Sequence, residues 1–322
     1  MDTQRRVLID TDTASDDAVA IIMALRSPLV RVVAITVVAG NVAVEQAARN
    51  ALYTAELCRS QVPIYMGASR PLVRELQTAD WFHGVDGLGD HGYSPVHRTA
   101  EPVHAVDAIV EAGLKYPGLE VVTLGPLTNI ALALERQPRI VKNISRCVVM
   151  GGAPCCEGNV TPAAEFNIWV DPDAARRVFL SGLPIEMIGW QLSRFDAVIN
   201  QNEIATIERL QNPLAEFAIH CNSTAAIAYH RQTGEVGISL PDPIAMAVFL
   251  DPELSLESSL HFVEIETVSD LTRGMTVVDR LSVTGDERNR AVWKEARLAS
   301  KARICWKLDV PGWKSALMTS LA

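Results

Sequence analysis

Four carboxylates fall within eight residues near the start of the chain, at Asp10, Asp12, Asp16 and Asp17. Like charges in one short loop repel one another unless a cation lies among them. Carboxylate oxygens are the ligands that Ca²⁺ and Mg²⁺ prefer. A helix dipole accounts for acids in a first helical turn, here Asp16 and Asp17, but not for Asp10 and Asp12. A cation site is therefore the better interpretation, and a solvated acidic turn is the alternative.

The segments on either side of these acids indicate a strand, a loop and a helix. Residues 7–9 are Val-Leu-Ile and predict a buried strand, and the apolar-rich segment from Ala18 onward predicts a helix. We expect Ser15 to cap that helix, because serine hydroxyls accept hydrogen bonds from the free N–H groups at helix starts. The acidic loop would then lie between a strand and a helix, which is the usual ligand-binding edge of an α/β sheet.

A second polar segment follows another predicted strand, at residues 146–150. It brings Asn159, Glu165 and Asn167 into one excursion from the end of that strand. Amides and a carboxylate can donate to and accept from the hydroxyls of a polyol. The segment therefore suggests a sugar-binding loop, and a polar surface loop is the alternative.

Two aspartates stand beside prolines in patterns typical of helix starts. Asp171 precedes Pro172, and we expect it to be a helix N-cap. Asp242 lies between Pro241 and Pro243, and capping is again the simple interpretation. A metal site anchored by the N-terminal acids would need a carboxylate from elsewhere in the chain, and Asp242 is the candidate.

Strand-like and helix-like segments alternate through the first two thirds of the chain. Strands are predicted at residues 31–38, 120–124, 146–150 and 185–188. Helices are predicted at residues 43–58, 105–116, 127–135 and 172–180. This alternation predicts an α/β fold with a mostly parallel central sheet flanked by helices and joined by right-handed crossovers.

Other segments depart from this alternation. Residues 67–98 break it, and their glycine, histidine and aromatic content favours a lid over a linker. Residues 213–232 predict one long helix, and a further helix should start at Pro241. Strands are expected again at residues 275–279 and 302–308.

Composition narrows the class of protein. Of the 322 residues, 48% are hydrophobic and 21% charged, which is typical of a globular protein with a sizeable core. We expect one domain over residues 1–322, with a small helical subdomain around residues 195–235 as an addition. The net charge of −9 argues against nucleic-acid binding, which needs Lys and Arg to neutralise phosphates. No apolar leader or bilayer-length apolar stretch is visible, so we expect no membrane contact and a cytoplasmic location.

The six cysteines form no C-x-x-C pair and no zinc-binding spacing, which favours reduced thiols. Cys155 and Cys156 fall inside the polar segment described above, where a thiol could reach a pocket. We assign neither of them a nucleophilic role.

Several motifs in one order resemble the inosine-uridine-preferring nucleoside hydrolase family over nearly the whole chain. They are the D-x-D-x-x-x-D-D opening, Val-Ala-Gly-Asn at 38–41, Gly-Pro-Leu-Thr-Asn at 125–129, the block 150–167, Asp242-Pro243 and Thr-Arg-Gly-Met-Thr-Val at 272–277. The resemblance implies the nucleoside hydrolase fold with a Rossmann-like core, a bound Ca²⁺ at the carboxyl ends of the strands, and a homodimer or homotetramer. It also implies hydrolysis of the N-glycosidic bond of ribonucleosides to free base and ribose.

The resemblance also suggests roles for single residues. Asp12 resembles the general base, which also faces the metal, while Asp17 and Asp242 resemble calcium ligands. The main-chain carbonyl of Leu124 resembles a further ligand. The residues that align with the ribose-binding set of the family are Asp16, Asn41, Met150, Asn159, Glu165 and Asn167.

One position departs from the family pattern. Many members carry a histidine immediately before the distant aspartate, where it is thought to protonate the leaving base, but this chain has Pro241 there. Proline has no side-chain proton to give, so another residue would have to approach the base. The candidates for base contact are Trp81, His83, Tyr229 and His230.

Two other functions remain open at this point. A nucleoside- or ribose-binding protein would keep the sugar site and lose turnover, which Pro241 favours and the retained Asp12 argues against. A phosphatase of the haloacid dehalogenase type also places D-x-D after its first strand. That class usually has Thr or Val where this chain has Ala14, and it leaves the Asp16-Asp17 pair unexplained.

Overall fold

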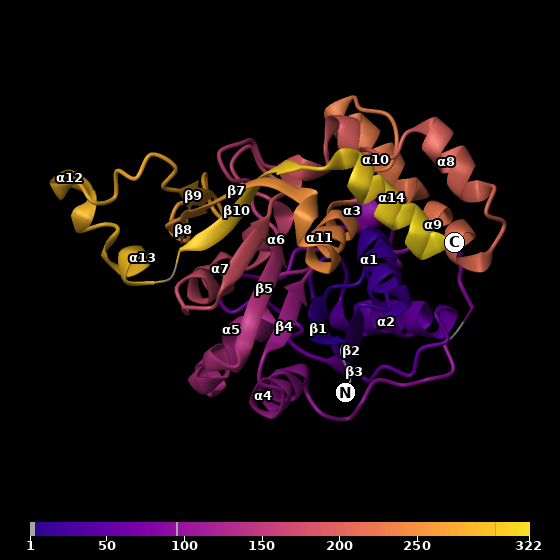
Figure 1. Ribbon diagram of the computed structural model, residues 1–322, viewed down its shortest axis with the longest axis horizontal. Helices are drawn as coiled ribbons and strands as arrows, with labels where there is room; N and C mark the ends of the chain where they lie inside the picture. Colours follow the sequence, from indigo (N-terminus) through magenta and orange to yellow (C-terminus); the bar gives the residue numbers. More distant parts are fainter. Residues whose placement is uncertain (1–3, 95, 300) are drawn as a thin grey trace.

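The computed structural model describes residues 4–94, 96–299 and 301–322 and is built around one large sheet (Figure 1). Its strand order is β3-β2-β1-β4-β5-β6-β10-β7, and only the β10–β7 pair is antiparallel. The strands are β1 (Arg5–Thr11), β2 (Val30–Val37), β3 (Ile64–Met66), β4 (Leu119–Thr123), β5 (Ile144–Met150), β6 (Ile185–Ile188), β7 (Ser255–His261) and β10 (Ala302–Leu308). The predicted α/β fold with a mostly parallel sheet is confirmed.

Strand β1 lies in the interior of the sheet, and its sequence explains why. Val7, Leu8 and Ile9 have no exposed surface, as expected for a strand covered on both faces. Asp10 pairs with Thr36 of β2 and Thr123 of β4. This register places the first of the acids at the carboxyl edge of the sheet, between two neighbouring strands.

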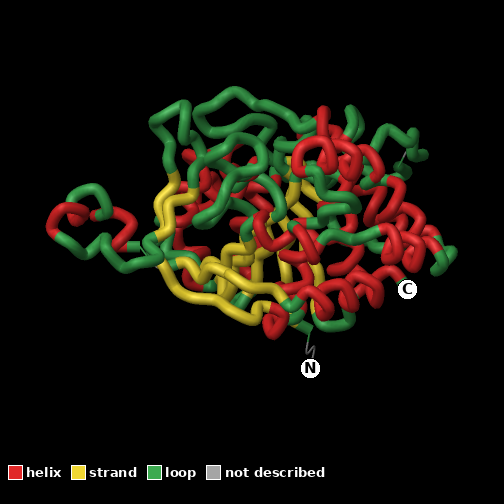
Figure 2. The backbone as a smooth tube through the Cα atoms, turned by 90° about the horizontal axis from the view of Figure 1, so that it is seen from above, coloured by secondary structure: helices red, strands yellow, loops and turns green. Residues whose placement is uncertain are grey.

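Helices cover both faces of the sheet (Figure 2). One hydrophobic core contains side chains of α1 (Ser15–Arg26), α2 (Val44–Leu57), α11 (Pro241–Leu250) and α14 (Val310–Leu321). A second core, on the other face, contains side chains of α4 (Ala105–Lys115), α5 (Thr128–Arg136) and α7 (Pro172–Phe179). The two faces therefore bury two separate apolar layers. Right-handed crossovers produce this arrangement when the strand order reverses, as it does at β1.

A group of helices lies beyond the carboxyl ends of the first strands. It contains α3 (Asp80–His83), α8 (Gln201–Glu208), α9 (Pro213–His220) and α10 (Ser223–Thr233). The prediction of one long helix over residues 213–232 is wrong, because the chain breaks at Cys221 and Asn222. There the Asn222 amide donates to the Ala218 carbonyl at 2.9 Å and to the Ser15 carbonyl at 3.3 Å.

Part of the C-terminal third projects from the body of the protein (Figure 1). Strands β8 (Val263–Ile265) and β9 (Thr276–Val278) pair only with each other, as a separate antiparallel sheet. The short helices α12 (Glu287–Arg290) and α13 (Lys294–Leu298) follow in the same projection. The strand predicted at residues 275–279 is thus present but lies outside the main sheet.

In the described parts of the chain, no helix has both the length and the apolar character needed to span a bilayer.

Candidate active site

A pocket opens at the carboxyl edge of the sheet, where β1, β4 and β5 end. The space inside it, counted out into the open mouth, is about 740 Å³. Its lining side chains come from the start of α1, from α3, from the short helix α6 (Phe166–Val170), from α10 and from the start of α11. Segments far apart in the sequence therefore meet around one cavity.

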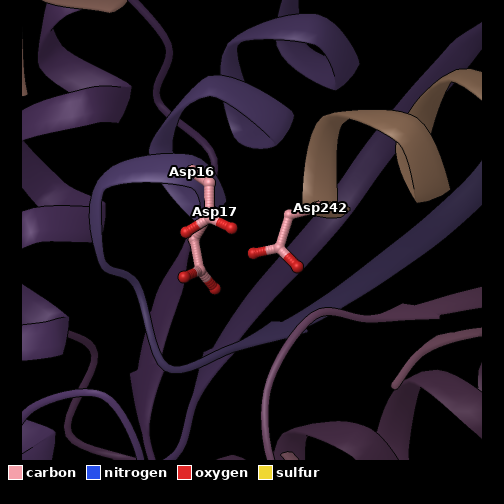
Figure 3. Close-up of side chains that lie close together, drawn as sticks. All are labelled: Asp16, Asp17 and Asp242. Carbon is pink, nitrogen blue, oxygen red and sulfur yellow. The ribbon is translucent and has the colours of Figure 1, made fainter. Parts of the chain in front are cut away.

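Three carboxylates converge at this pocket, from Asp16, Asp17 and Asp242 (Figure 3). One oxygen of each lies within 4.8 Å of the others, and all three residues are buried. Asp16 and Asp17 belong to the first turn of α1, whereas Asp242 belongs to the first turn of α11, which packs against α1. We call these three residues the acid trio.

The electrostatics of the acid trio fit a bound cation. Burial raises the pKa of Asp16 and of Asp17 from 3.8 to about 6. Burial, and after it the negative charges of Asp16 and Asp17, hold the pKa of Asp242 well above its usual range. Asp16 Oδ1 is sealed from solvent and has no hydrogen-bond partner. A divalent ion would supply the missing partner and remove the cost of three buried charges.

The helix cap expected at Ser15 is wrong, and the alternative interpretation of Asp242 as a helix cap does not hold either. Helix α1 begins at Ser15 with Ala14 as its N-cap, and it is Asp17 Oδ2 that accepts the Ala14 N–H, at 2.9 Å. Helix α11 has Leu240 as its N-cap, so Asp242 lies inside the first turn and is free to face the pocket. The cap at Asp171 is confirmed, since its side chain accepts the Ala174 N–H at 3.0 Å.

Asp12 lies close to the acid trio without belonging to it. Its Oδ2 accepts the Asn41 N–H at 2.6 Å, while its Oδ1 is sealed from solvent and unpartnered. A Cβ atom at Gly40 or at Gly125 would collide with this carboxylate, so both glycines make room for it. Burial, and then the charge of Asp17, raises the pKa of Asp12 well above its usual range. Asp12 is thus a buried carboxylate with one free oxygen.

Asp10 holds the strands together behind the pocket. Its Oδ1 accepts from Thr36 Oγ1 at 2.6 Å and from Asn129 Nδ2 at 2.9 Å. Asn129 Oδ1 in turn accepts the Ala68 N–H at 2.9 Å. Asp10 therefore fixes neighbouring elements and does not reach the cavity, whose lining does not include it.

The residues expected to hold the ribose line the pocket together. Asn167 Nδ2 donates to the Leu124 carbonyl at 2.7 Å, which places that carbonyl at the cavity wall. Glu165 caps α6 by accepting the N–H groups of Asn167 and Ile168, and burial raises its pKa to about 7. The residues of the expected set that border the cavity are Asp16, Asn41, Met150, Asn159, Glu165 and Asn167.

The expected base-contacting residues divide into two groups. Trp81, His83 and Tyr229 line the pocket, with Trp81 57% exposed at its mouth. His230 does not line the pocket: it is exposed, and its Nδ1 pairs with the Glu235 carbonyl at 3.0 Å. Adjacent helix positions point about 100° apart, so α10 turns Tyr229 inward and His230 outward.

The two neighbouring cysteines lie away from the pocket. Cys155 and Cys156 do not border the cavity, and Cys155 is exposed.

Several polar or aromatic lining residues were not predicted, because they stand singly in the sequence without a motif. They are Trp190, Ser193, Asn222, Gln232 and Ser239.

A parallel α/β sheet with a carboxylate-rich pocket at its carboxyl edge is typical of enzymes that bind a small polar ligand. A family model described as inosine-uridine preferring nucleoside hydrolase matches residues 7–313. The chain belongs to this family, and it is an N-glycosyl hydrolase.

Individual relatives agree with this assignment. A protein of Shewanella woodyi named pyrimidine-specific ribonucleoside hydrolase RihA is 40% identical over 296 residues, which cover 89% of this chain and 92% of that protein. A solved plant nucleoside hydrolase, the PpNRh1 enzyme, superposes with a TM-score of 0.91 at 30% identity, over 98% of each chain. A purine-preferring ribonucleoside hydrolase from Gardnerella vaginalis superposes with a TM-score of 0.87 at 32% identity, also over 98% of each chain.

Proposed function

We propose that the protein hydrolyses the N-glycosidic bond of ribonucleosides in a Ca²⁺-dependent reaction. The observation that carries the proposal is the convergence of Asp16, Asp17 and Asp242 beside the polar lining expected for a sugar. Relatives are named for pyrimidine and for purine substrates. We therefore propose ribonucleosides as the substrate class and leave the base to measurement.

The donor set favours calcium over softer metals. Asp17, Asp242 and the Leu124 carbonyl offer only hard oxygen atoms, and the Asp12 carboxylate lies next to them. When bound, Ca²⁺ supplies positive charge that holds the ribose diol and orients a water molecule. Calcium acidifies water less than zinc does, so a carboxylate has to take the proton.

Asp12 is our candidate for that base. As the attacking water forms its bond to C1′, one of its protons passes to Asp12 Oδ1, and the electron pair of the breaking C1′–N bond goes to the leaving base. The sugar carries oxocarbenium-like charge in the transition state. The Asn41 N–H anchors Oδ2, which leaves Oδ1 as the free proton acceptor. A raised pKa suits Asp12 to this role, because it makes the carboxylate a better base.

The remaining polar groups would position the sugar. Asp16, Asn41 and Asn167 line the cavity, and Asn41 Nδ2 lies 3.5 Å from Asp17 Oδ2. We assign these three residues to the 2′- and 3′-hydroxyls. Asn159 and Glu165 are assigned to the 5′-hydroxyl. Binding energy from this remote hydroxyl can help distort the ribose toward the transition state.

Stabilisation of the leaving base needs a group other than residue 241, which is proline. His83 is buried in the cavity wall, and Trp81 can stack on a base at the mouth. Desolvation by burial lowers the pKa of His83 to about 4, so the ring is neutral at pH 7 and can donate one N–H.

The experiment is a sugar-release assay on the chelator-treated protein. We expect ribose release from at least one of uridine, cytidine, inosine and adenosine after Ca²⁺ is added, and little release in its absence. A protein that binds ribose tightly but turns over none of the four would favour the binding-protein interpretation instead. Release of phosphate from phosphomonoesters without sugar release would favour the phosphatase interpretation.

A further inference from the structure

Ser15 makes a contact that the reaction described above does not use. It is the first residue of α1 and has no exposed surface. Its Oγ lies 2.8 Å from Nδ1 of His83, which belongs to α3. Across the described residues this is the only hydrogen bond that the Ser15 hydroxyl makes. The contact joins the start of α1 directly to His83, the part of the pocket wall that we expect to meet the nucleobase.

Hydrogen-bond accounting assigns the direction of this contact. A buried hydroxyl hydrogen left without an acceptor is costly, and Nδ1 of His83 is the acceptor within reach. Asp16 Oδ1 lies 3.9 Å from the same Nδ1, which is too far for it to take a hydrogen from the ring. Ser15 therefore donates to Nδ1, and a neutral His83 carries its proton on Nε2.

The other ring nitrogen, Nε2 of His83, is neither paired nor sealed from solvent within the described parts of the chain. His83 lines the pocket. The free N–H is therefore presented to whatever occupies the base side of the site.

The backbone of Ser15 is also held in place, through its carbonyl group. The Ser15 carbonyl accepts from Asn222 Nδ2 at 3.3 Å and from Cys221 Sγ at 3.5 Å, at the break between α9 and α10. Helix α3 also packs against α10. Ser15 thus links α1, α3 and the α9–α10 break, so its hydroxyl has a fixed place from which to orient the His83 ring.

We propose that Ser15 is a positioning residue: it fixes the Nε2–H tautomer of His83, so that this N–H donates to the departing nucleobase. The inference rests on the proposed nucleoside hydrolysis. Negative charge develops on the base as the C1′–N bond breaks, and a preorganised donor stabilises that charge in the transition state. Pro241 leaves room for this arrangement, because it brings no competing donor.

The first test reads the tautomer directly in the whole protein. Nitrogen-15 NMR of the histidine rings, with His83 assigned by a His83→Gln variant, should show the proton on Nε2 in the wild type. In Ser15→Ala the His83 signals should move toward the other tautomer or a mixture. A wild-type ring protonated on Nδ1 would overturn the proposal, and so would an unchanged tautomer in Ser15→Ala.

The second test uses two leaving groups. For Ser15→Ala we expect kcat/KM for a nucleoside to fall roughly tenfold, the size of one ordinary net hydrogen bond, because the variant loosens the donor without removing it. The kcat/KM for p-nitrophenyl β-D-ribofuranoside should stay unchanged, because nitrophenolate leaves without needing a hydrogen-bond donor. Thr54→Val is the control for general destabilisation. It removes a buried hydroxyl whose only hydrogen bond among the described residues is to the Asn50 carbonyl of the same helix. Equal slowing of both substrates would contradict the inference.

The two hypotheses fail in different ways. If the wild type releases sugar from neither substrate, the proposed function is wrong, whatever the NMR spectrum shows. If the wild type is active but Ser15→Ala is not selective for the leaving group, only the role of Ser15 is wrong.

Discussion

A buried carboxylate with one anchored and one free oxygen is suited to accept a proton, and Asp12 has this form. In Asp12→Asn the side-chain carbonyl can still accept the Asn41 N–H, so the loop should keep its shape. We expect kcat to fall by about 10²–10⁴-fold, the usual contribution of a general base. Steady-state kinetics with thermal melting as a folding check would measure it. An unchanged kcat would remove Asp12 from the mechanism.

At the scale of single residues, the sequence predicted chemistry better than placement. The clustering of Asp10, Asp12, Asp16 and Asp17 indicated a cation site, because like charges in one short loop repel one another without a cation. It did not indicate that Asp10 faces away, toward Thr36 and Asn129, because that depends on which strands neighbour β1.

Among the secondary-structure elements, helix α11 can be tested through its first residue. Pro241 is the first residue of this helix and lines the pocket, and a residue at that position needs no N–H for the helix. Pro241→His should therefore fold and add a second donor near the leaving base. We expect nucleoside turnover to rise by about tenfold or more, with little change for p-nitrophenyl riboside.

A matched control exists for this substitution. Pro252 opens a short 3-10 helix (Pro252–Leu254) in the same way and does not line the pocket. Pro252→His should leave both activities unchanged. Lower nucleoside turnover in Pro241→His, with the control unaffected, would show that the site does not accept a donor at this position.

Elements with a strong apolar period were predicted from the sequence, whereas tertiary contacts decided the others. Most of the alternating strands and helices of residues 7–188 were predicted from local patterns, but the short elements β3, α3 and α6 were not. The break between α9 and α10 does not, because it depends on an Asn222 side chain that reaches back to Ser15 and Ala218. The separate β8–β9 sheet likewise requires knowledge of which strand edges remain available.

The whole molecule has to tolerate its buried acids, and this makes its stability depend on pH. In the calcium-free protein, burial raises the pKa of Asp10 to about 7 and those of Asp16 and Asp17 to about 6. The folded state thus binds protons more tightly than the unfolded state. The resulting stabilisation is complete below about pH 4 and is lost as the pH rises through 6 to 7.

Thermal unfolding in a chelator should therefore give a lower Tm at pH 8 than at pH 5.5. Calcium binds the deprotonated carboxylates, so the increase in Tm on adding Ca²⁺ should be larger at pH 8 than at pH 5.5. A chelated protein whose stability rises over this range, or a calcium effect that shrinks, would contradict the electrostatic account.

The convergence of the acid trio is also a property of the whole molecule, and sequence motifs alone could not show it. Asp17 and Asp242 are 225 positions apart, and they meet because α11 packs against α1 on one face of the sheet. The sequence suggested Asp242 only as a candidate, since a proline-flanked aspartate is more simply a helix cap. Asp242 lies in the first turn of α11, and the packing of this helix turns it toward the acids of α1 (Figure 3).

Calorimetric titration of Ca²⁺ into the chelator-treated protein tests the central claim most directly, with Asp242→Asn compared against Asp251→Asn. Both aspartates precede a proline, but Asp251 is exposed and caps the 3-10 helix that follows it. We expect one calcium site in the wild type, weakened about tenfold or more in Asp242→Asn because affinity follows the number of charged ligands, and unchanged in Asp251→Asn. Equal affinity in all three proteins would contradict the account.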